Sequence, residues 1–295
     1  MFESLPPLDP AVQSAYLARL GVEALDVQPP SAQALRRVAE RHAERVAYET
    51  LWIQAGGRWG IAPAESAARV AYTGRGGYCF HLNGALGLLL HSLGYAVRAH
   101  VGGVHGTPEH DPDAAGNHLV LTVTGLPDET NPAGTWYVDN GLGDALYDPL
   151  PLVAGAYPQP PFRLTLQRLG EDGWQLQHDP AGGFDHMIWT DAIAQRSDFE
   201  TKHTLLSTSP DSGFVQVPMA ERRDATGVDV IRGLARSRIG DGAFNAEPVT
   251  VRQAWFELLA DDFGMRLDGT PPEARERLWA AAVAAQRRWE ATRIT

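Results

Sequence analysis

Residues 72–95, YTGRGGYCFHLNGALGLLLHSLGY, constrain the fold of this chain more than any other segment. Their apolar part predicts a helix that begins near Cys79 and ends at Gly94, with its leucines on one broad face. Gly76 and Gly77 precede the helix and allow a tight turn with positive φ. The sequence therefore predicts a tight glycine turn that leads directly into the N-terminus of a helix.

The pattern of the chain changes from helical to extended after this helix. Before it, a helix is predicted from Asp9-Pro10 to Gly21, and another opens at Ser31 as N-cap. After it come β-rich segments separated by turn residues, which indicate a small barrel or sandwich. These segments are YAVRAHVGGV, NHLVLTVTG, TWYVDNG, FRLTLQRLG and GWQLQHD.

The last third of the chain is predicted to mix short strands with helices. A turn is expected at Asp241-Gly242, and helices are expected over residues 250–264 and 271–291. A chain of 295 residues also exceeds the usual size of one domain, so two or three domains are expected.

Charge and cysteine content narrow the setting. The formal net charge of -11 argues against a nucleic acid as the main partner. Cys79 is the only cysteine, so an internal disulfide is excluded. The first residues lack the basic and apolar regions of a signal peptide, and no apolar run approaches the ~18 residues that span a membrane. We expect a cytoplasmic, reducing location and no membrane partner.

Cys79 is a candidate nucleophile because of its place at a helix N-terminus. Free N–H groups and the positive end of the helix dipole favour a thiolate there. A small buried residue is an equally simple interpretation, since free cysteine is often buried. A nucleophilic thiol needs a base and an orienting carboxylate. His118, at the start of one strand, and Asp139, at the end of another, are candidates; a surface strand residue and a turn former are the alternatives.

Several motifs, taken together and in order, resemble the arylamine N-acetyltransferase family. RGGYCFHLN is similar to that family's R-G-G-x-C-x-E-x-N motif, and HLVLTV and VDNGLGD fall where the family carries its catalytic histidine and aspartate. LLSTSPDSGF resembles its S/T-S-P-x-S-x-F segment, and FELLADDFGM resembles its C-terminal motif. YLARLG and HAERVAYETL resemble its N-terminal helical signatures. The resemblance extends over nearly the whole chain.

The resemblance implies an α+β fold in three parts. These are a helical bundle over residues 1–93, a β-barrel over residues 94–205 and an α/β lid over residues 206–295. It also implies ping-pong transfer of an acetyl group from acetyl-CoA, through Cys79, to an arylamine, arylhydrazine or arylhydroxylamine. Acetyl-CoA would be the donor co-substrate, with no permanently bound cofactor and no metal. A homo-oligomer is left open.

The same resemblance assigns roles to single residues. Cys79, His118 and Asp139 would form the catalytic triad, and Thr208, Ser209 and Ser212 would contact the coenzyme.

The sequence departs from the family's pattern at three positions. His81 replaces the usual glutamate, which leaves Glu49 as the candidate partner of Arg75. His81 could itself be taken for the base, but two positions after the cysteine on a helix it is expected to point away. Leu142 replaces an aromatic residue of the acceptor pocket, which indicates a larger acceptor or one that is not a simple aniline. Asp211 stands where a small polar residue is common, and is expected to point outward.

Three other functions stay open at this point. A cysteine hydrolase uses the same triad geometry, and an amide synthase of natural-product biosynthesis would use a larger acyl thioester. A binding protein without activity is the third, although the intact candidate triad argues against it. His100, His105 and His110 lie in a Gly/Pro/Asp-rich stretch, where a solvated loop is expected rather than a metal site.

Overall fold

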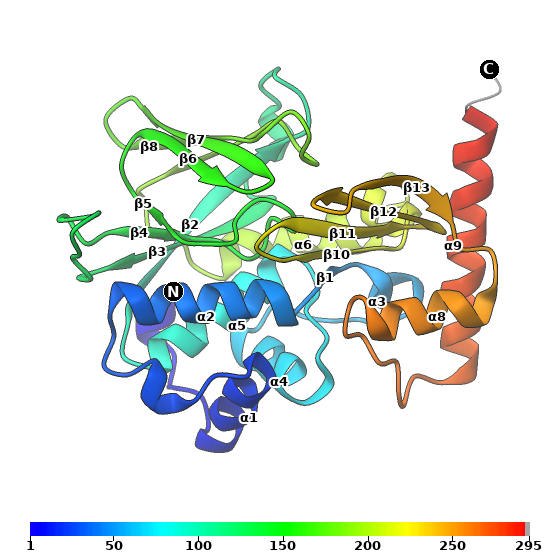
Figure 1. Ribbon diagram of the computed structural model, residues 1–295, viewed down its shortest axis with the longest axis horizontal. Helices are drawn as coiled ribbons and strands as arrows, with labels where there is room; N and C mark the ends of the chain where they lie inside the picture. The colour runs from blue at the N-terminus through cyan, green and yellow to red at the C-terminus, as the bar shows by residue number, and fades with distance from the viewer. Residues whose placement is uncertain (293–295) are drawn as a thin grey trace.

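The first part of the chain is helical, as the sequence predicts. The computed structural model describes residues 1–292 (Figure 1). The longer helices of this part are α1 (Pro10–Leu20), α2 (Ala32–Arg45), α4 (Pro63–Thr73) and α5 (Cys79–Ser92), and α3 (Leu51–Gln54) is a single turn. The short 3₁₀ turns η1 (Phe2–Ser4) and η2 (Ala24–Asp26) also lie in this part, and a third, η3 (Pro112–Ala114), follows later in the chain.

Local capping fixes where the first two helices begin and end. The Asp9 carboxylate accepts the Ala11 N–H at 2.8 Å, and α1 ends at Gly21 in the left-handed conformation with φ 66°. The Ser31 hydroxyl accepts the Ala34 N–H at 3.1 Å at the start of α2. These bounds were predicted because the signals lie within a few residues of each helix end.

The middle of the chain forms an eight-stranded antiparallel sheet that curls into a barrel-like shape (Figure 1). Its order is β5-β4-β3-β2-β9-β8-β7-β6. The strands are β2 (Ala96–His105), β3 (His118–Thr124), β4 (Trp136–Val138), β5 (Leu150–Pro151), β6 (Gly155–Gln159), β7 (Phe162–Leu169), β8 (Gly173–Gln177) and β9 (His186–Thr190). The α+β fold with a central barrel is thus confirmed.

Residues 197–205, which the sequence assigned to strands and turns, are helical. They belong to α6 (Ser197–Thr208), so the expected boundary between residues 205 and 206 falls inside this helix. Asp198 and Glu200 lie in its first turn, where acidic groups favour a helix. Phe199 packs on Phe80 of α5 with ring centroids 5.3 Å apart.

The last part of the chain holds a second antiparallel sheet of order β1-β10-β11-β12-β13. Its strands are β1 (Tyr48–Glu49), β10 (Met219–Arg223), β11 (Gly227–Arg232), β12 (Ala235–Gly240) and β13 (Phe244–Pro248), and α7 (Gly213–Gln216), α8 (Arg252–Asp261) and α9 (Pro272–Thr292) accompany it. The turn expected at Asp241-Gly242 joins β12 to β13. Although β1 comes from the N-terminal third, it pairs with β10, which places it at the edge of this sheet.

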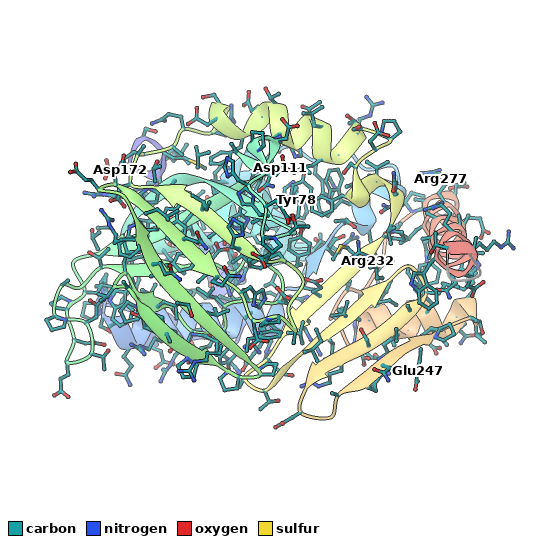
Figure 2. The ribbon with its side chains drawn as sticks, turned by 90° about the horizontal axis from the view of Figure 1, so that it is seen from above. Tyr78, Asp111, Asp172, Arg232, Glu247 and Arg277 are labelled. Carbon is teal, nitrogen blue, oxygen red and sulfur yellow. The ribbon has the colours of Figure 1, made fainter. Side chains whose placement is uncertain are left out.

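Helix α5 forms the centre of the largest hydrophobic core. Every residue from Cys79 to Leu90 is buried, so the helix is covered on all sides rather than on its leucine face alone. Apolar residues of α1, α2 and α4 cover it on one side, and those of β2 and β3 on another. In the view of Figure 2, Tyr78, which precedes Cys79, lies between strands β6–β8 and the second sheet.

Candidate active site

Cys79 is the first residue of α5 and borders a small cavity. Gly77 has φ 80°, and a Cβ on Gly76 would lie 2.2 Å from the Ala47 carbonyl oxygen, so both glycines of the turn are required. The Cys79 side chain is buried, and its thiol donates to the Asn117 carbonyl oxygen at 3.4 Å. The cavity has a volume of about 150 Å³ and is lined by Tyr48, Cys79, Val104, Asn117, His118, Gly141, Leu142, Phe184, Leu206 and Phe214.

His118 and Asp139 meet as expected from their places on neighbouring strands. His118 opens β3, and Asp139 directly follows β4, which pairs with β3. The distance from His118 Nε2 to Asp139 Oδ2 is 2.7 Å, and both side chains are buried. Because Nε2 of His118 bonds Asp139, Nδ1 is the ring nitrogen available to interact with the Cys79 thiol.

The electrostatics of this site favour a charged His118 imidazole. Burial opposes the imidazolium, but the charges of Asp139 and Cys79, together with hydrogen bonds to both, outweigh it and raise the His118 pKa to about 10. Such an imidazole can hold a proton taken from the thiol.

Asp139 is held by three donors besides His118. The Asn83 amide donates to Oδ1 at 2.6 Å, the Gly141 N–H donates to Oδ1 at 2.9 Å, and the Tyr137 hydroxyl donates to Oδ2 at 2.9 Å. The sequence reasoning gave none of these three a role. Asn83 lies inside the RGGYCFHLN segment, and this position was the one available signal.

Gly141 also has a steric role beside the thiol. A Cβ at this position would lie 2.8 Å from Cys79 Cα and 2.8 Å from Asn83 Nδ2. The turn after Asp139 can therefore approach the start of α5 only with glycine at this position.

His81 lies away from the Asp139 carboxylate, in an aromatic cluster. Its ring centroid is 4.7 Å from that of Tyr78 and 5.6 Å from that of Trp52. Burial, followed by the charges of Arg69 and His203, holds the pKa of His81 well below its usual value.

A capping bond explains how histidine can stand at this position. His81 Nδ1 accepts the Tyr78 N–H at 3.3 Å, and this is the contact that a glutamate three residues after an N-cap makes in a capping box. His81 thus caps the start of α5 with a ring nitrogen where a capping box uses a carboxylate.

Glu49 is the partner of Arg75, as the sequence analysis proposed. Arg75 Nη2 lies 2.8 Å from Glu49 Oε1, and Nε donates to the same oxygen at 3.0 Å.

Thr208, Ser209 and Ser212 lie at the junction of α6 and α7, next to the cavity but outside its wall. Their neighbours Leu206 and Phe214 line the cavity with Cys79. Thr208 Oγ1 donates to the Thr204 carbonyl at 2.7 Å, and Ser212 Oγ donates to the Leu206 carbonyl at 2.6 Å.

Ser209 and Ser212 are half-buried, whereas Thr208 is exposed. Ser209 Oγ accepts the Asp211 N–H at 3.3 Å, and Asp211 is exposed.

The expectation of a solvated loop was wrong for His100 and His105. Both are buried in β2. His100 Nε2 lies 2.8 Å from Thr122 Oγ1, and His105 stacks on His186 with ring centroids 4.4 Å apart. Residues 1–292 contain no group of three or more His, Cys, Asp or Glu placed to hold a metal ion.

None of the helices described within residues 1–292 has the length and apolar character needed to cross a membrane.

Comparison with known proteins identifies the class of protein to which the chain belongs. Residues 31–271 match the family described as N-acetyltransferase, so the chain is a transferase. The arylamine N-acetyltransferase of Mycolicibacterium smegmatis is 33% identical over 208 residues, covering 68% of this chain and 72% of the relative. Human arylamine N-acetyltransferase 1 is 29% identical over 247 residues, covering 74% and 80%.

Solved structures agree with the sequence matches. The arylamine N-acetyltransferase of Mycobacterium marinum has a TM-score of 0.79 and 26% identity, covering 92% of this chain and 98% of that one. The structure of the same enzyme in complex with CoA gives the same TM-score, identity and coverage. The chain belongs to the arylamine N-acetyltransferase family.

Proposed function

We propose that this enzyme transfers an acetyl group from acetyl-CoA, through a thioester on Cys79, to the amine of an arylamine, arylhydrazine or arylhydroxylamine. The observation that carries the proposal is the distance of 2.7 Å between His118 Nε2 and Asp139 Oδ2, with His118 and Cys79 on the wall of one cavity.

In the first half-reaction, His118 takes the Cys79 proton and Asp139 stabilises the imidazolium. The thiolate attacks the thioester carbonyl, the bond from carbon to the coenzyme sulfur breaks, and the coenzyme leaves as a thiol with the proton from His118. This exchange of one thioester for another is close to energetic balance. In the second half-reaction, the neutral amine attacks the acetyl carbonyl and passes its proton to His118, and Cys79 is restored.

The cavity supports an aromatic acceptor. Its volume of about 150 Å³ resembles that of an apolar cavity that holds one benzene ring. Val104, Leu142, Phe184 and Phe214 supply apolar wall beside Cys79. Leu142 would shape the part of this wall that faces the acceptor ring.

Thr208, Ser209 and Ser212 are proposed to contact the coenzyme, because their segment flanks the cavity through Leu206 and Phe214. A cytoplasmic location is proposed as well, since a nucleophilic thiol works only where it stays reduced.

The mass of the intact protein tests the function. Mixing with acetyl-CoA should add one acetyl group, and a panel of aromatic amines should then remove it. Cys79→Ala should not be acetylated, while Ser4→Ala, a change at an exposed hydroxyl far from Cys79 in sequence, serves as the control. Loss of the acetyl group in buffer as fast as with amine would favour a hydrolase and contradict the proposal.

A further inference from the structure

A second hollow, of about 550 Å³, lies between the helical part of the chain and the loop that leads into α9. Trp52, Trp59, Arg69 and Arg75 contribute to its wall from the helical side. Its complete lining is Trp52, Ala55, Gly56, Gly57, Trp59, Arg69, Thr73, Arg75, Arg266, Leu267, Asp268, Gly269, Thr270, Pro271, Ala274, Arg277 and Leu278. The cavity of Cys79 shares no lining residue with it. Its size suits a small organic ligand.

The wall of this hollow has an excess of positive charge in a chain whose net charge is -11. Four arginines line it against a single acidic residue, Asp268. One of the four, Arg75, is paired with the buried Glu49 behind the wall. Setting Asp268 and the two carboxylates that act on these arginines, Glu49 and Glu65, against the four arginines leaves one positive charge around the concavity.

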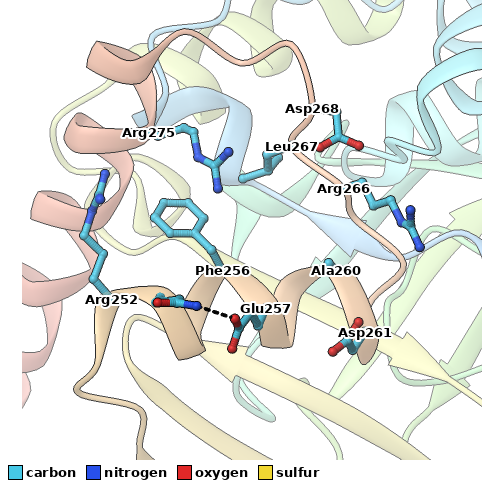
Figure 3. Close-up of a pocket in the computed structure, with 10 residues that line it drawn as sticks. Arg252, Phe256, Glu257, Ala260, Asp261, Arg266, Leu267, Asp268 and Arg275 are labelled. Atoms are coloured by element: carbon cyan, nitrogen blue, oxygen red, sulfur yellow. Dashed lines mark hydrogen bonds between the residues drawn. The ribbon is translucent and has the colours of Figure 1, made fainter.

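A neighbouring hollow lacks the excess of positive charge found around Arg69. Figure 3 shows that hollow, which lies against α8, the start of α9 and the loop between them. Its charged lining residues balance: Arg252, Arg266 and Arg275 against Glu257, Asp261 and Asp268. Of these two neighbouring hollows, the one at Arg69 has the excess of positive charge.

One buried N–H donor of the Arg69 guanidinium, at Nη1, has no hydrogen-bond acceptor among the described residues. The guanidinium lies over the Trp59 ring, with Cζ 4.0 Å from the centroid, so stacking fixes its plane. Burial lowers the pKa of Arg69 to about 10, although the nearby charges of Glu49 and Glu65 favour its protonated form.

Arg277 and Arg266 differ in whether their guanidinium groups are already bonded within the protein. Arg277 Nη2 donates to the Ala55 carbonyl at 2.7 Å, which ties α9 to the end of α3. Arg266 is exposed on the loop after α8 (Figure 3). A ligand in the hollow could therefore be held by a fixed donor, Arg69, and by a free one, Arg266.

We propose that this hollow binds the phosphomonoester group of a small molecule, with the Arg69 guanidinium as its fixed donor. A phosphomonoester carries close to two negative charges at neutral pH, so it is attracted by the excess of positive charge on the wall. Its oxygens accept paired N–H donors from a planar guanidinium, and Arg69 has an unused buried donor. Bound there, the phosphate would connect α4 of the helical part with the α8–α9 loop.

Thermal unfolding and calorimetric titration with inorganic phosphate and with phenyl phosphate test the proposal. Chloride at equal ionic strength is the reference. We expect saturable binding and a rise of the unfolding midpoint of about 2–4 °C near saturation. Arg69→Gln should weaken phosphate binding about tenfold or more, and Arg69→Lys should weaken it less, because lysine keeps the charge but not the planar fork.

Two further variants keep the test decisive if Arg69 variants fold poorly. Arg266→Gln, at an exposed position, should also weaken binding, whereas Arg275→Gln removes one charge from the hollow of Figure 3 and should leave it unchanged. Equal affinity in wild type, Arg69→Gln and Arg266→Gln would overturn the proposal, as would a phosphate effect no larger than that of chloride.

Competition identifies the source of the phosphate. Displacement of phenyl phosphate by coenzyme A, but not by dephospho-coenzyme A, would assign the site to the coenzyme's own phosphomonoester. Lack of displacement by both would support a separate phosphorylated ligand. Both readouts are binding measurements, so they do not depend on acetyl transfer.

Discussion

Arg75, which lies in the glycine turn before Cys79, forms a mostly buried ion pair with Glu49. Arg75 Nη2 lies 2.8 Å from Glu49 Oε1, and the Glu49 side chain is completely buried. The Glu49 N–H also donates to the Gly77 carbonyl at 2.9 Å, so side chain and backbone both attach this segment to the glycine turn. The arginine of the turn is thus held by a carboxylate from another part of the chain, and His81 is free to act as a cap.

Breaking this pair should destabilise the protein. Glu49→Gln leaves a mostly buried arginine without its counter-charge, so we expect a loss of about 3–5 kcal/mol in the free energy of unfolding. Urea denaturation measures this loss in the free energy of unfolding. The matched control is Glu200→Gln, which breaks the exposed pair with Arg196 and should cost less than ~1 kcal/mol. A similar small loss for both variants would contradict the structural importance of the buried pair.

Asn83 should matter more for catalysis than for stability. Asn83→Ala removes the amide that donates to Asp139 at 2.6 Å, so the carboxylate and with it His118 lose a fixed orientation. A hydrogen bond to a charged group is worth about 1.5–3 kcal/mol, so kcat/KM should fall by roughly 10- to 100-fold. Steady-state kinetics per folded enzyme checks this.

A second buried asparagine supplies the control for that measurement. Asn131→Ala removes an amide that donates to the Thr135 carbonyl at 2.7 Å, outside the residues that hold Asp139. It should lower the unfolding midpoint but leave kcat/KM nearly unchanged. Equal kinetic losses in the two variants would show that Asn83 acts through stability alone.

His118 should make the stability of the fold depend on pH. Its pKa is raised from 6.5 to about 10 in the folded state, so the folded protein holds this proton more tightly than the unfolded chain. The resulting stabilisation, on the order of a few kcal/mol, is fully present below pH 6.5 and is lost as the pH rises through about 10.

Asp139→Asn removes the charge that contributes most to this shift, so it should reduce the pH dependence. Urea unfolding of wild type and variant from pH 6 to 10 provides the measurement. The advantage of the wild type should shrink as the pH rises. A constant difference across the range would mean that His118 does not retain its proton in the folded state.

Gly141→Ala should impair the site by steric conflict. The added Cβ would lie 2.8 Å from Cys79 Cα, so either the turn or the start of α5 must shift. We expect a stability loss of about 1–3 kcal/mol and at least a ~10-fold lower rate of Cys79 alkylation by iodoacetamide. Gly106→Ala, whose Cβ would meet nothing within 4 Å, should change neither quantity appreciably. If Cys79 in Gly141→Ala were alkylated at the wild-type rate, the close approach of Gly141 to Cys79 would be ruled out.

Asp211 should not help to bind the donor. It is exposed beside the segment proposed to contact a phosphate-bearing coenzyme, so any repulsion should be modest, ~1 kcal/mol or less. Asp211→Ser should therefore leave the KM for acetyl-CoA unchanged or lower it. Thr208→Val is expected to raise this KM, and a marked rise for Asp211→Ser instead would mean that the aspartate fixes the loop.

Features set by neighbouring residues could be predicted from the sequence. The caps at Asp9 and Ser31 and the end of α1 at Gly21 depend on contacts within a few residues, and they lie where expected. Strand pattern placed His118 and Asp139 at strand ends, and the family resemblance then favoured their pairing over a surface residue and a turn former.

Features created by distant contacts could not be predicted. Glycine, proline and aspartate around His100 and His105 indicated solvent, but both are buried, His100 against Thr122 of β3 and His105 against His186 of β9. The bond from Asn83 to Asp139 depends on how closely α5 approaches the turn after β4, which a single sequence does not record. The positive hollow at Arg69 likewise arises from residues far apart in the chain.

The pairing of β1 with β10 has a consequence during synthesis on the ribosome. Tyr48 and Glu49 lie ahead of Cys79 in the chain, yet their strand partners, Glu221 and Ala220, are made only in its last third. A nascent chain that already contains Cys79, His118 and Asp139 therefore still has an unpaired β1 edge next to the glycine turn. Translation must continue through β10 before that edge is closed, so the strand beside the turn that presents Cys79 gains its partner only late in synthesis.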